Sequence, residues 1–109
     1  MKLTELNDAE LSALLAEEQQ PLLAVFSAAW SRPARTMVPL LEDLVPDYRG
    51  LVRFALVNAD TAPQALSRYG VLSLPTYIMF RRGRMTDRFI GLLTKESLIE
   101  EIEASLQKV

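Results

Sequence analysis

The segment LLAVFSAAWSRPA, residues 22–34, joins a continuous apolar run to a proline-containing stretch. The run Leu22–Phe26 is typical of a strand that is buried on both faces of a helix-covered sheet. Arg32 and Pro33 then begin a helix, because the missing N–H of a proline costs nothing in a first turn. Ser31 stands at the N-cap position, where we expect its hydroxyl to cap the helix. The segment therefore predicts a strand, a turn and a helix.

The rest of the chain continues this alternation of strand and helix. Apolar runs predict further strands at Leu3–Leu6, Leu51–Val57, Thr76–Phe80 and Met85–Ile90. Capping and periodicity predict helices after Asn7, at Ala62–Tyr69 and after Thr94, while Pro39 should kink the second helix and Pro46 should end or distort it. A hairpin turn at Arg81–Arg84 adds an antiparallel edge. The prediction is an α/β fold, one domain over residues 1–109, whose central mixed sheet has helices on both faces.

The composition excludes several kinds of chemistry. The chain has 109 residues, of which 50% are hydrophobic and 24% charged, as in an ordinary globular protein. It contains no cysteine and no histidine, so it offers no thiol nucleophile, thiolate ligand or imidazole base. A nucleophilic Ser31 would need an adjacent base, and Arg32 and Arg35 cannot accept a proton. We therefore expect no catalytic residue, no metal and no cofactor.

Charge and hydropathy limit the expected partners and location. The net charge of -2 gives no reason to expect nucleic-acid binding. The longest apolar candidate, Leu22–Trp30, is shorter than the roughly 20 residues of a membrane span. The acidic N-terminus lacks the apolar stretch of a signal peptide. We expect a cytoplasmic protein that binds neither membrane nor nucleic acid.

Arginine is concentrated in the middle of the chain. Nine arginines lie between residues 32 and 88, against five acidic residues in the same interval. One interpretation is a solvated surface with ordinary ion pairs, and the other is a basic patch for an acidic partner. The sequence leaves both open.

The segment Phe26–Ala34 resembles the active-site segment of thioredoxins, in which an apolar strand leads to Trp-Cys-x-Pro-Cys at a helix start. The resemblance extends over essentially the whole chain, and its pieces follow the family's order and spacing. The further matching pieces are Pro39, Val57-Asn58-Ala59-Asp60, Tyr69-Gly70-Val71, Leu74-Pro75-Thr76, Phe80-Arg81-Arg82-Gly83 and Gly91. The resemblance implies the thioredoxin fold.

The chain departs from the family at the residues that carry its redox chemistry. Ser31 and Ala34 stand at the positions of the two cysteines, Val25 at the buried aspartate and Leu56 at the neighbouring lysine. Exchange of disulfides needs a thiolate and a second, resolving thiol. Without sulfur, a charged aspartate in the core would lower the stability by roughly several kcal/mol and would have no redox function. Val25 and Leu56 therefore look like adaptation after the chemistry was lost, which laboratory removal of two cysteines would not produce.

The resemblance also implies a peptide-binding groove around Pro75. In the family this proline is preceded by a cis peptide bond, and the backbone before it pairs with an extended substrate segment as an added strand. The residues that the resemblance assigns to this groove are Trp30, Ser31, Ala59, Ser73, Leu74, Pro75, Ile90, Gly91 and Leu92. The alternative is that cis-Pro75 merely shapes its loop and that Trp30 merely packs on it.

Three functions follow from these observations. The first is a redox-inactive thioredoxin-fold protein that binds a protein or an extended peptide segment, as chaperone or assembly modules do. The replacement of a cysteine by Ser31 resembles bacterial chaperone-type members of the family. The second is a thioredoxin-type protein disulfide oxidoreductase whose active-site cysteines are replaced in this form. The third is a purely structural subunit, for example in a homo-oligomer.

Overall fold

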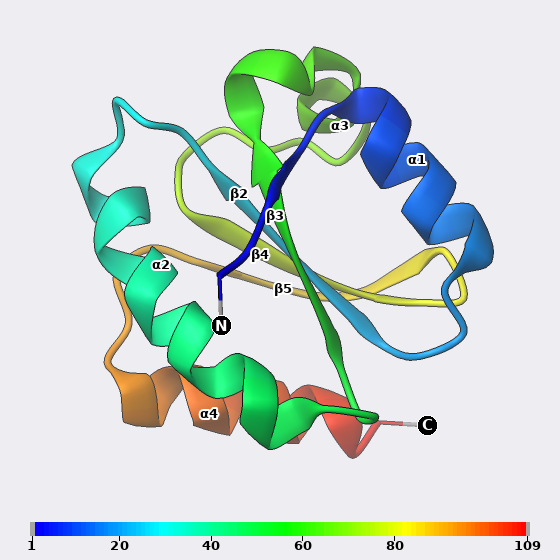
Figure 1. The fold of residues 1–109 in the computed structure, drawn as a ribbon, viewed down its shortest axis with the longest axis vertical. Helices are drawn as coiled ribbons and strands as arrows, with labels where there is room; N and C mark the ends of the chain where they lie inside the picture. The colour runs from blue at the N-terminus through cyan, green and yellow to red at the C-terminus, as the bar shows by residue number, and fades with distance from the viewer. Residues whose placement is uncertain (1, 109) are drawn as a thin grey trace.

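The structure, a computed structural model, describes residues 2–108 (Figure 1). Its strands are β1 (Glu5–Leu6), β2 (Leu22–Ser27), β3 (Arg53–Asn58), β4 (Thr76–Arg81) and β5 (Arg84–Ile90). Its helices are α1 (Asp8–Glu17), α2 (Arg32–Leu44), α3 (Pro63–Arg68) and α4 (Lys95–Leu106), with the 3₁₀ turns η1 (Val45–Tyr48) and η2 (Ala59–Thr61). This order confirms the predicted alternation.

The strands form one mixed sheet in the order β1-β3-β2-β4-β5. β1 and β2 run parallel to β3, whereas β4 runs antiparallel to both β2 and β5. The closing hairpin therefore supplies the antiparallel edge, as predicted. β2 lies at the centre, and all six of its residues are buried. Its unbroken apolar sequence fits that position, because both faces of a central strand are covered.

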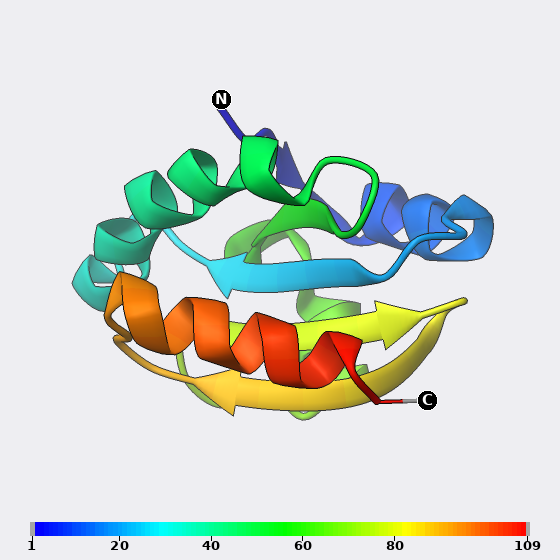
Figure 2. The ribbon, with the colours of Figure 1, turned by 90° about the horizontal axis from the view of Figure 1, so that it is seen from below.

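Helices cover both faces of the sheet. α2 and α4 lie on one face, where Met37, Leu41 and Ile102 pack against buried residues of the strands. α1 and α3 lie on the other face, around Leu11 and Ala65. Figure 2 shows α4 beside α2 and across β4 and β5, with α1 set apart from them. Two apolar cores thus hold the sheet in place between four helices.

The helix starts follow the capping signals in the sequence. Asn7 caps α1 in a reciprocal capping box with Glu10, and Thr94 caps α4 by accepting from the Ser97 N–H at 3.0 Å. α2 continues through Pro39 to Leu44, and the turn η1 that contains Pro46 follows it directly. These caps and the two prolines were visible in the sequence alone.

Several element boundaries differ from the prediction by one or more residues, and three of them have an identifiable physical reason. The first strand is confined to Glu5–Leu6, because the Leu3 N–H donates to Glu42 Oε2 at 2.8 Å instead of pairing with β3. β3 begins at Arg53, because the N–H groups of residues 51 and 52 donate to the Tyr48 carbonyl and extend the turn. α3 begins at Pro63, because Ala62 has the non-helical dihedrals φ -130 and ψ 49.

Candidate functional site

Four neighbouring strands end or begin at the same end of the sheet. Phe26 on β2 lies opposite Val57 on β3 and opposite Thr76 on β4, and Thr76 lies opposite Ile90 on β5. The segments that follow β2, β3 and β5 and precede β4 therefore emerge together. These segments carry eight of the nine residues that the resemblance assigns to the groove, and the ninth, Ile90, is the last residue of β5. We call this end of the molecule the loop face, made of residues 28–31, 59–62, 70–75 and 90–93.

Trp30 is the most prominent aromatic residue of the loop face. Its side chain is 68% exposed, although its indole Nε1 donates to Asp60 Oδ1 at 3.0 Å. Asp60 belongs to η2, after β3, so this hydrogen bond ties the segment after β2 to the segment after β3. The bond fixes the orientation of a large apolar ring that nevertheless stays accessible to a partner.

The segment before β4 presents an unpaired stretch of backbone. The Leu74–Pro75 peptide bond is cis, as the resemblance implies. The Pro75 carbonyl accepts from the Gly91 N–H at 2.9 Å, and the Thr76 hydroxyl donates to the Ser73 carbonyl at 2.7 Å. Leu74 lies between these two anchors, and within residues 2–108 its backbone N–H and carbonyl form no hydrogen bond. An extended segment could pair with them by adding a strand.

Several large apolar side chains of the loop face are exposed. Ile90 is 52% exposed and Leu92 is 60% exposed, while Leu72 reaches 97%. A run of exposed apolar side chains around an available backbone is typical of an interaction site rather than of an ordinary surface. Leu72 and Asp60 were absent from the predicted site. Leu72 is one of three apolar residues between Gly70 and Pro75, and the sequence does not show which of the three is exposed.

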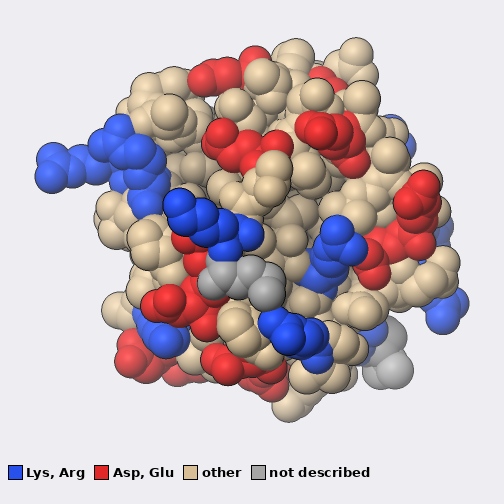
Figure 3. Space-filling view, in the orientation of Figure 1, with Lys and Arg blue, Asp and Glu red and all other residues tan. Residues whose placement is uncertain are grey.

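Ser31 and Ala34, at the positions of the family's cysteines, are buried parts of the start of α2. Ser31 is 6% exposed and its Oγ accepts from the Ala34 N–H at 3.3 Å, which confirms the predicted cap. Ala34 is 1% exposed. The first turn of α2 contains no acidic residue, and Arg35 Nη1 donates to the Ala29 carbonyl at 2.5 Å. Figure 3 shows Lys and Arg atoms projecting over this end of α2.

The core beneath the loop face is apolar where the family carries charge. Val25 and Leu56 belong to the core cluster under α2 and α4. Tyr77 lies opposite Val25 on β4, and burial raises the pKa of its hydroxyl well above the usual value. That hydroxyl donates to the Gly91 carbonyl at 3.0 Å and so supports the segment after β5 from within the core. These groups stabilise the site without offering an acid or a base at neutral pH.

The predicted groove residues differ in what they can offer a partner. Trp30, Ser73, Ile90 and Leu92 have exposed side chains, and Leu74 and Gly91 are half-buried. Ser31, Ala59 and Pro75 are buried, so they shape the face from below. Across residues 2–108, the acidic side chains form no group of three that could hold a metal ion. None of the helices described in this range is long and apolar enough to span a membrane.

The fold and the loop face together define a thioredoxin-like α/β protein that has lost its thiols. The thioredoxin family model matches residues 2–104, and the chain belongs to the thioredoxin family. It is 34% identical over 106 residues to thioredoxin M4 of Arabidopsis thaliana, a chloroplast protein. That alignment covers 97% of this chain and 55% of the Arabidopsis protein. It is 29% identical over 102 residues to thioredoxin 1 of Nostoc sp.. That alignment covers 94% of this chain and 95% of the Nostoc protein.

Some of these relatives are longer than this chain. The chain spans about half the length of the first chloroplast relatives that it matches, including the M-type thioredoxin of Pisum sativum at 32% identity. A cytoplasmic location for this chain remains a prediction. The assignment to the family rests on nearly the whole chain, so the expected fold is confirmed.

Proposed function

We propose that this protein is a redox-inactive thioredoxin-family module that binds extended segments of other proteins at the loop face. The observation that carries the proposal is the unpaired backbone of Leu74 beside the exposed side chains of Trp30, Leu72 and Ile90. A chaperone-type or assembly-type role is what we propose on this basis, because strand addition draws its affinity from main-chain hydrogen bonds that any sequence supplies.

The chemistry at the start of α2 supports binding without catalysis. Thiol–disulfide exchange needs two thiols, and this chain supplies none. Ser31 Oγ is committed to capping the helix, and no side-chain base hydrogen-bonds to it among the described residues. A hydroxyl without a base is a poor nucleophile. Without thiol chemistry, the loop face still has the exposed side chains and the unpaired backbone that peptide binding requires.

Isothermal titration calorimetry with an unfolded model protein tests the proposal. Reduced and carboxymethylated α-lactalbumin serves as the probe, because it exposes extended apolar segments and has no free thiol. We expect the double variant Trp30→Ala/Leu72→Ser to bind at least tenfold more weakly than the wild type, since about 1–3 kcal/mol is lost when a well-packed apolar anchor is removed.

Leu51→Ser is the matched control variant. Leu51 is 57% exposed, but it lies in the turn after η1, away from the loop face. Its affinity for the probe should stay within about twofold of the wild type, as is usual for an exposed residue outside an interface. Equal weakening by both variants, or wild-type affinity in the double variant, contradicts the proposal.

A further inference from the structure

We propose that a second site, the cavity between α1, α3 and the β4–β5 hairpin, binds an acidic segment of a partner protein. One apolar side chain of that segment would rest on the floor of the cavity, and its carboxylates would pair with Arg68 and Arg82. The cavity extends along α1, from Asp8 and Gln64 near the start of α3 to Arg82 and Gly83 in the hairpin, and none of its lining residues belongs to the loop face. It is therefore separate from the proposed peptide site.

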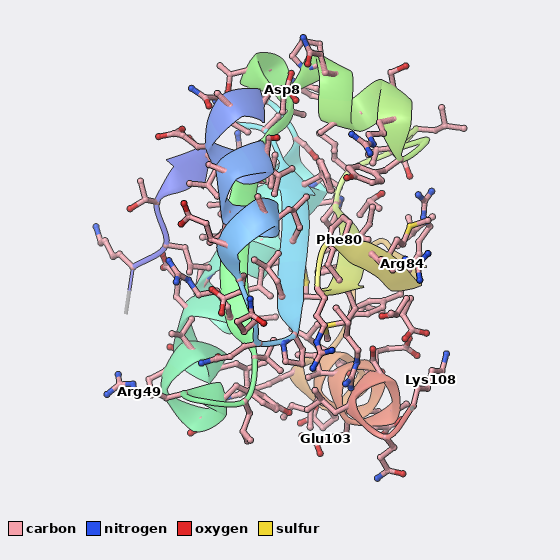
Figure 4. The ribbon with its side chains drawn as sticks, turned by 90° about the vertical axis from the view of Figure 1, so that its right-hand side faces the viewer. Asp8, Arg49, Phe80, Arg84, Glu103 and Lys108 are labelled. Atoms are coloured by element: carbon pink, nitrogen blue, oxygen red, sulfur yellow. The ribbon has the colours of Figure 1, made fainter. Side chains whose placement is uncertain are left out.

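The cavity has a volume of about 410 Å³, and its surface is more polar than apolar, with the half-buried Leu15 and Tyr69 contributing an apolar part of its floor. Leu11 and Leu15 of α1 line one side, and Ala65 and Tyr69 line the side toward α3. Figure 4 looks onto this side of the molecule, with α1 in the foreground, α3 above it and the strands leading to the labelled Arg84 at the right. The volume falls within the range of about 300–1,000 Å³ that is typical of ligand sites, and it suits a side chain of leucine size with its flanking backbone.

Positive charge dominates the wall of the cavity. Arg68 and Arg82 both line it, and neither forms an ion pair within residues 2–108. The one carboxylate in the lining belongs to Asp8, and both of its oxygens accept backbone hydrogen bonds at 2.9 Å, from Gln64 and Ala65 at the start of α3. Asp8 is thus committed to capping α3, and the two guanidinium groups remain available for a carboxylate from outside.

One of the two cationic groups, that of Arg68, contacts an aromatic ring that is itself held in place. The Arg68 guanidinium carbon lies 5.7 Å from the centre of the Tyr69 ring, which packs edge-on against Phe80 with ring centres 5.1 Å apart. Arg88 donates to the carbonyls of Gly70 and Tyr69 and fixes the end of α3. A site whose groups are already ordered loses less conformational entropy on binding.

The hairpin turn places Arg82 beside the cavity. Arg82 and Gly83 are the central residues of a two-residue hairpin, and their φ values of 51° and 79° are both positive, as a type I′ turn requires. The neighbouring Gly83 lies so close to α1 that an added Cβ would be 3.3 Å from the Leu15 carbonyl. The hairpin therefore lies against α1, and this contact places Arg82 at the edge of the cavity.

An acidic protein segment fits this cavity better than a nucleic acid does. Nucleic-acid binding typically uses about six to ten phosphate contacts, and the cavity offers two arginines. The apolar floor has no role against a phosphate backbone, whereas it suits one leucine or similar residue flanked by glutamates. Arginine is among the residues that are enriched at protein interfaces.

An NMR titration of the whole chain, labelled with ¹⁵N, tests the inference. The probe is an acetylated and amidated pentapeptide of sequence Glu-Glu-Leu-Glu-Glu, compared with Gln-Gln-Leu-Gln-Gln and Glu-Glu-Ser-Glu-Glu. We expect saturable amide shifts in α1, α3 and the hairpin with the first peptide and at least tenfold weaker binding of the other two. Shifts that cluster around Trp30 instead, or no shifts at millimolar peptide, would overturn the inference.

Two double variants that remove positive charge distinguish binding at the cavity from non-specific electrostatic attraction. Arg68→Gln/Arg82→Gln should weaken binding of the acidic peptide at least tenfold. Arg32→Gln/Arg49→Gln removes the same charge from exposed arginines outside the cavity and should change binding less than twofold. Equal weakening by the two pairs overturns the inference, because it would show only non-specific attraction.

Binding of the acidic peptide at the cavity is independent of the function proposed for the loop face. Trp30→Ala/Leu72→Ser should bind the acidic peptide as the wild type does, since neither residue lines the cavity. Arg68→Gln/Arg82→Gln should in turn keep its affinity for carboxymethylated α-lactalbumin. Failure of either proposal can thus be told apart from failure of the other.

Discussion

Val25 on β2 and Leu56 on β3 lie directly opposite each other in the parallel ladder, beneath the loop face. Both side chains are buried, with exposed fractions of 1% and 4%. The family's buried aspartate and lysine correspond by resemblance to these two positions, so one apolar pair replaces a polar pair. The replacement is consistent with a protein in which the core no longer has to move protons for a thiol.

Restoring the aspartate alone should destabilise the protein. Val25→Asp places an unpaired carboxylate in the core, and we expect the free energy of unfolding to fall by about 3–5 kcal/mol at pH 7. Adding Leu56→Lys should recover part of that loss by supplying a partner. Urea denaturation of both variants measures the effect. A loss below about 1 kcal/mol for Val25→Asp would show that the site is wetter than the structure indicates.

Restoring the two cysteines alone should give little disulfide reductase activity. In Ser31→Cys/Ala34→Cys the thiols return, but Val25 and Leu56 still leave the neighbouring core without the acid and lysine that the family uses. We expect reduction of insulin by dithiothreitol to proceed near its uncatalysed rate with this variant and to accelerate when Val25→Asp and Leu56→Lys are added. Robust turnover by the double cysteine variant would indicate that the loss of redox chemistry is superficial.

Much of this architecture was predictable from sequence because the signals are local. The apolar run at β2, the caps Asn7 and Thr94 and the glycine of the hairpin each act within a few residues. The boundary of the first strand failed because it depends on a contact distant in sequence, that of Leu3 with Glu42, whereas the starts of β3 and α3 depend on turn geometry that the apolar pattern does not report. The exposure of Leu72 and the bond from Trp30 to Asp60 also arise only when separate segments meet at one end of the sheet.

The hydrogen bond between Trp30 and Asp60 should set the geometry of the loop face. Asp60→Ala removes the acceptor and frees the indole, so we expect about 2- to 10-fold weaker binding of carboxymethylated α-lactalbumin, in line with about 0.5–1.5 kcal/mol for one hydrogen bond. Trp30 is the single tryptophan, and its fluorescence anisotropy should fall as the ring becomes mobile. Asp43→Ala, an exposed residue of α2, is the control. Unchanged anisotropy in Asp60→Ala would contradict the role given to this bond.

The Ser31 hydroxyl should act as a helix cap and nothing more. Ser31→Ala leaves the Ala34 N–H without its partner, and we expect the protein to lose about 1 kcal/mol of stability, whereas Ser31→Gly should cost only a few tenths. Thermal unfolding of the two variants measures the difference. If Ser31→Gly proves as destabilising as Ser31→Ala, the cap does not explain why serine occupies this position.

The end of α4 should carry a pH-dependent contribution to stability. Asp87 accepts from the Ser105 hydroxyl at 2.7 Å and from Lys108. Burial alone would raise the pKa of Asp87, but these hydrogen bonds and the nearby Lys108 and Arg81 charges lower it below the usual 3.8. Because the folded state favours the charged form, the stabilisation is present above the unfolded pKa and is lost as the pH falls through the folded one.

The variant Asp87→Asn isolates this contribution. We expect it to lower the free energy of unfolding by about 1 kcal/mol between about pH 5 and pH 8, and the difference from the wild type to shrink as the pH falls below about 4. Urea denaturation at a series of pH values measures the difference. A difference that grows toward acid would reverse the sign given to the pKa shift.

Amide hydrogen exchange at Leu74, followed by NMR with and without carboxymethylated α-lactalbumin, tests the central claim most directly. The free protein should exchange this N–H rapidly, because no described group accepts from it. A bound segment that adds a strand should slow its exchange at least tenfold, while the amide of Leu51 stays unchanged. Saturating binding that leaves the exchange rate of Leu74 as it was would contradict recognition through this backbone.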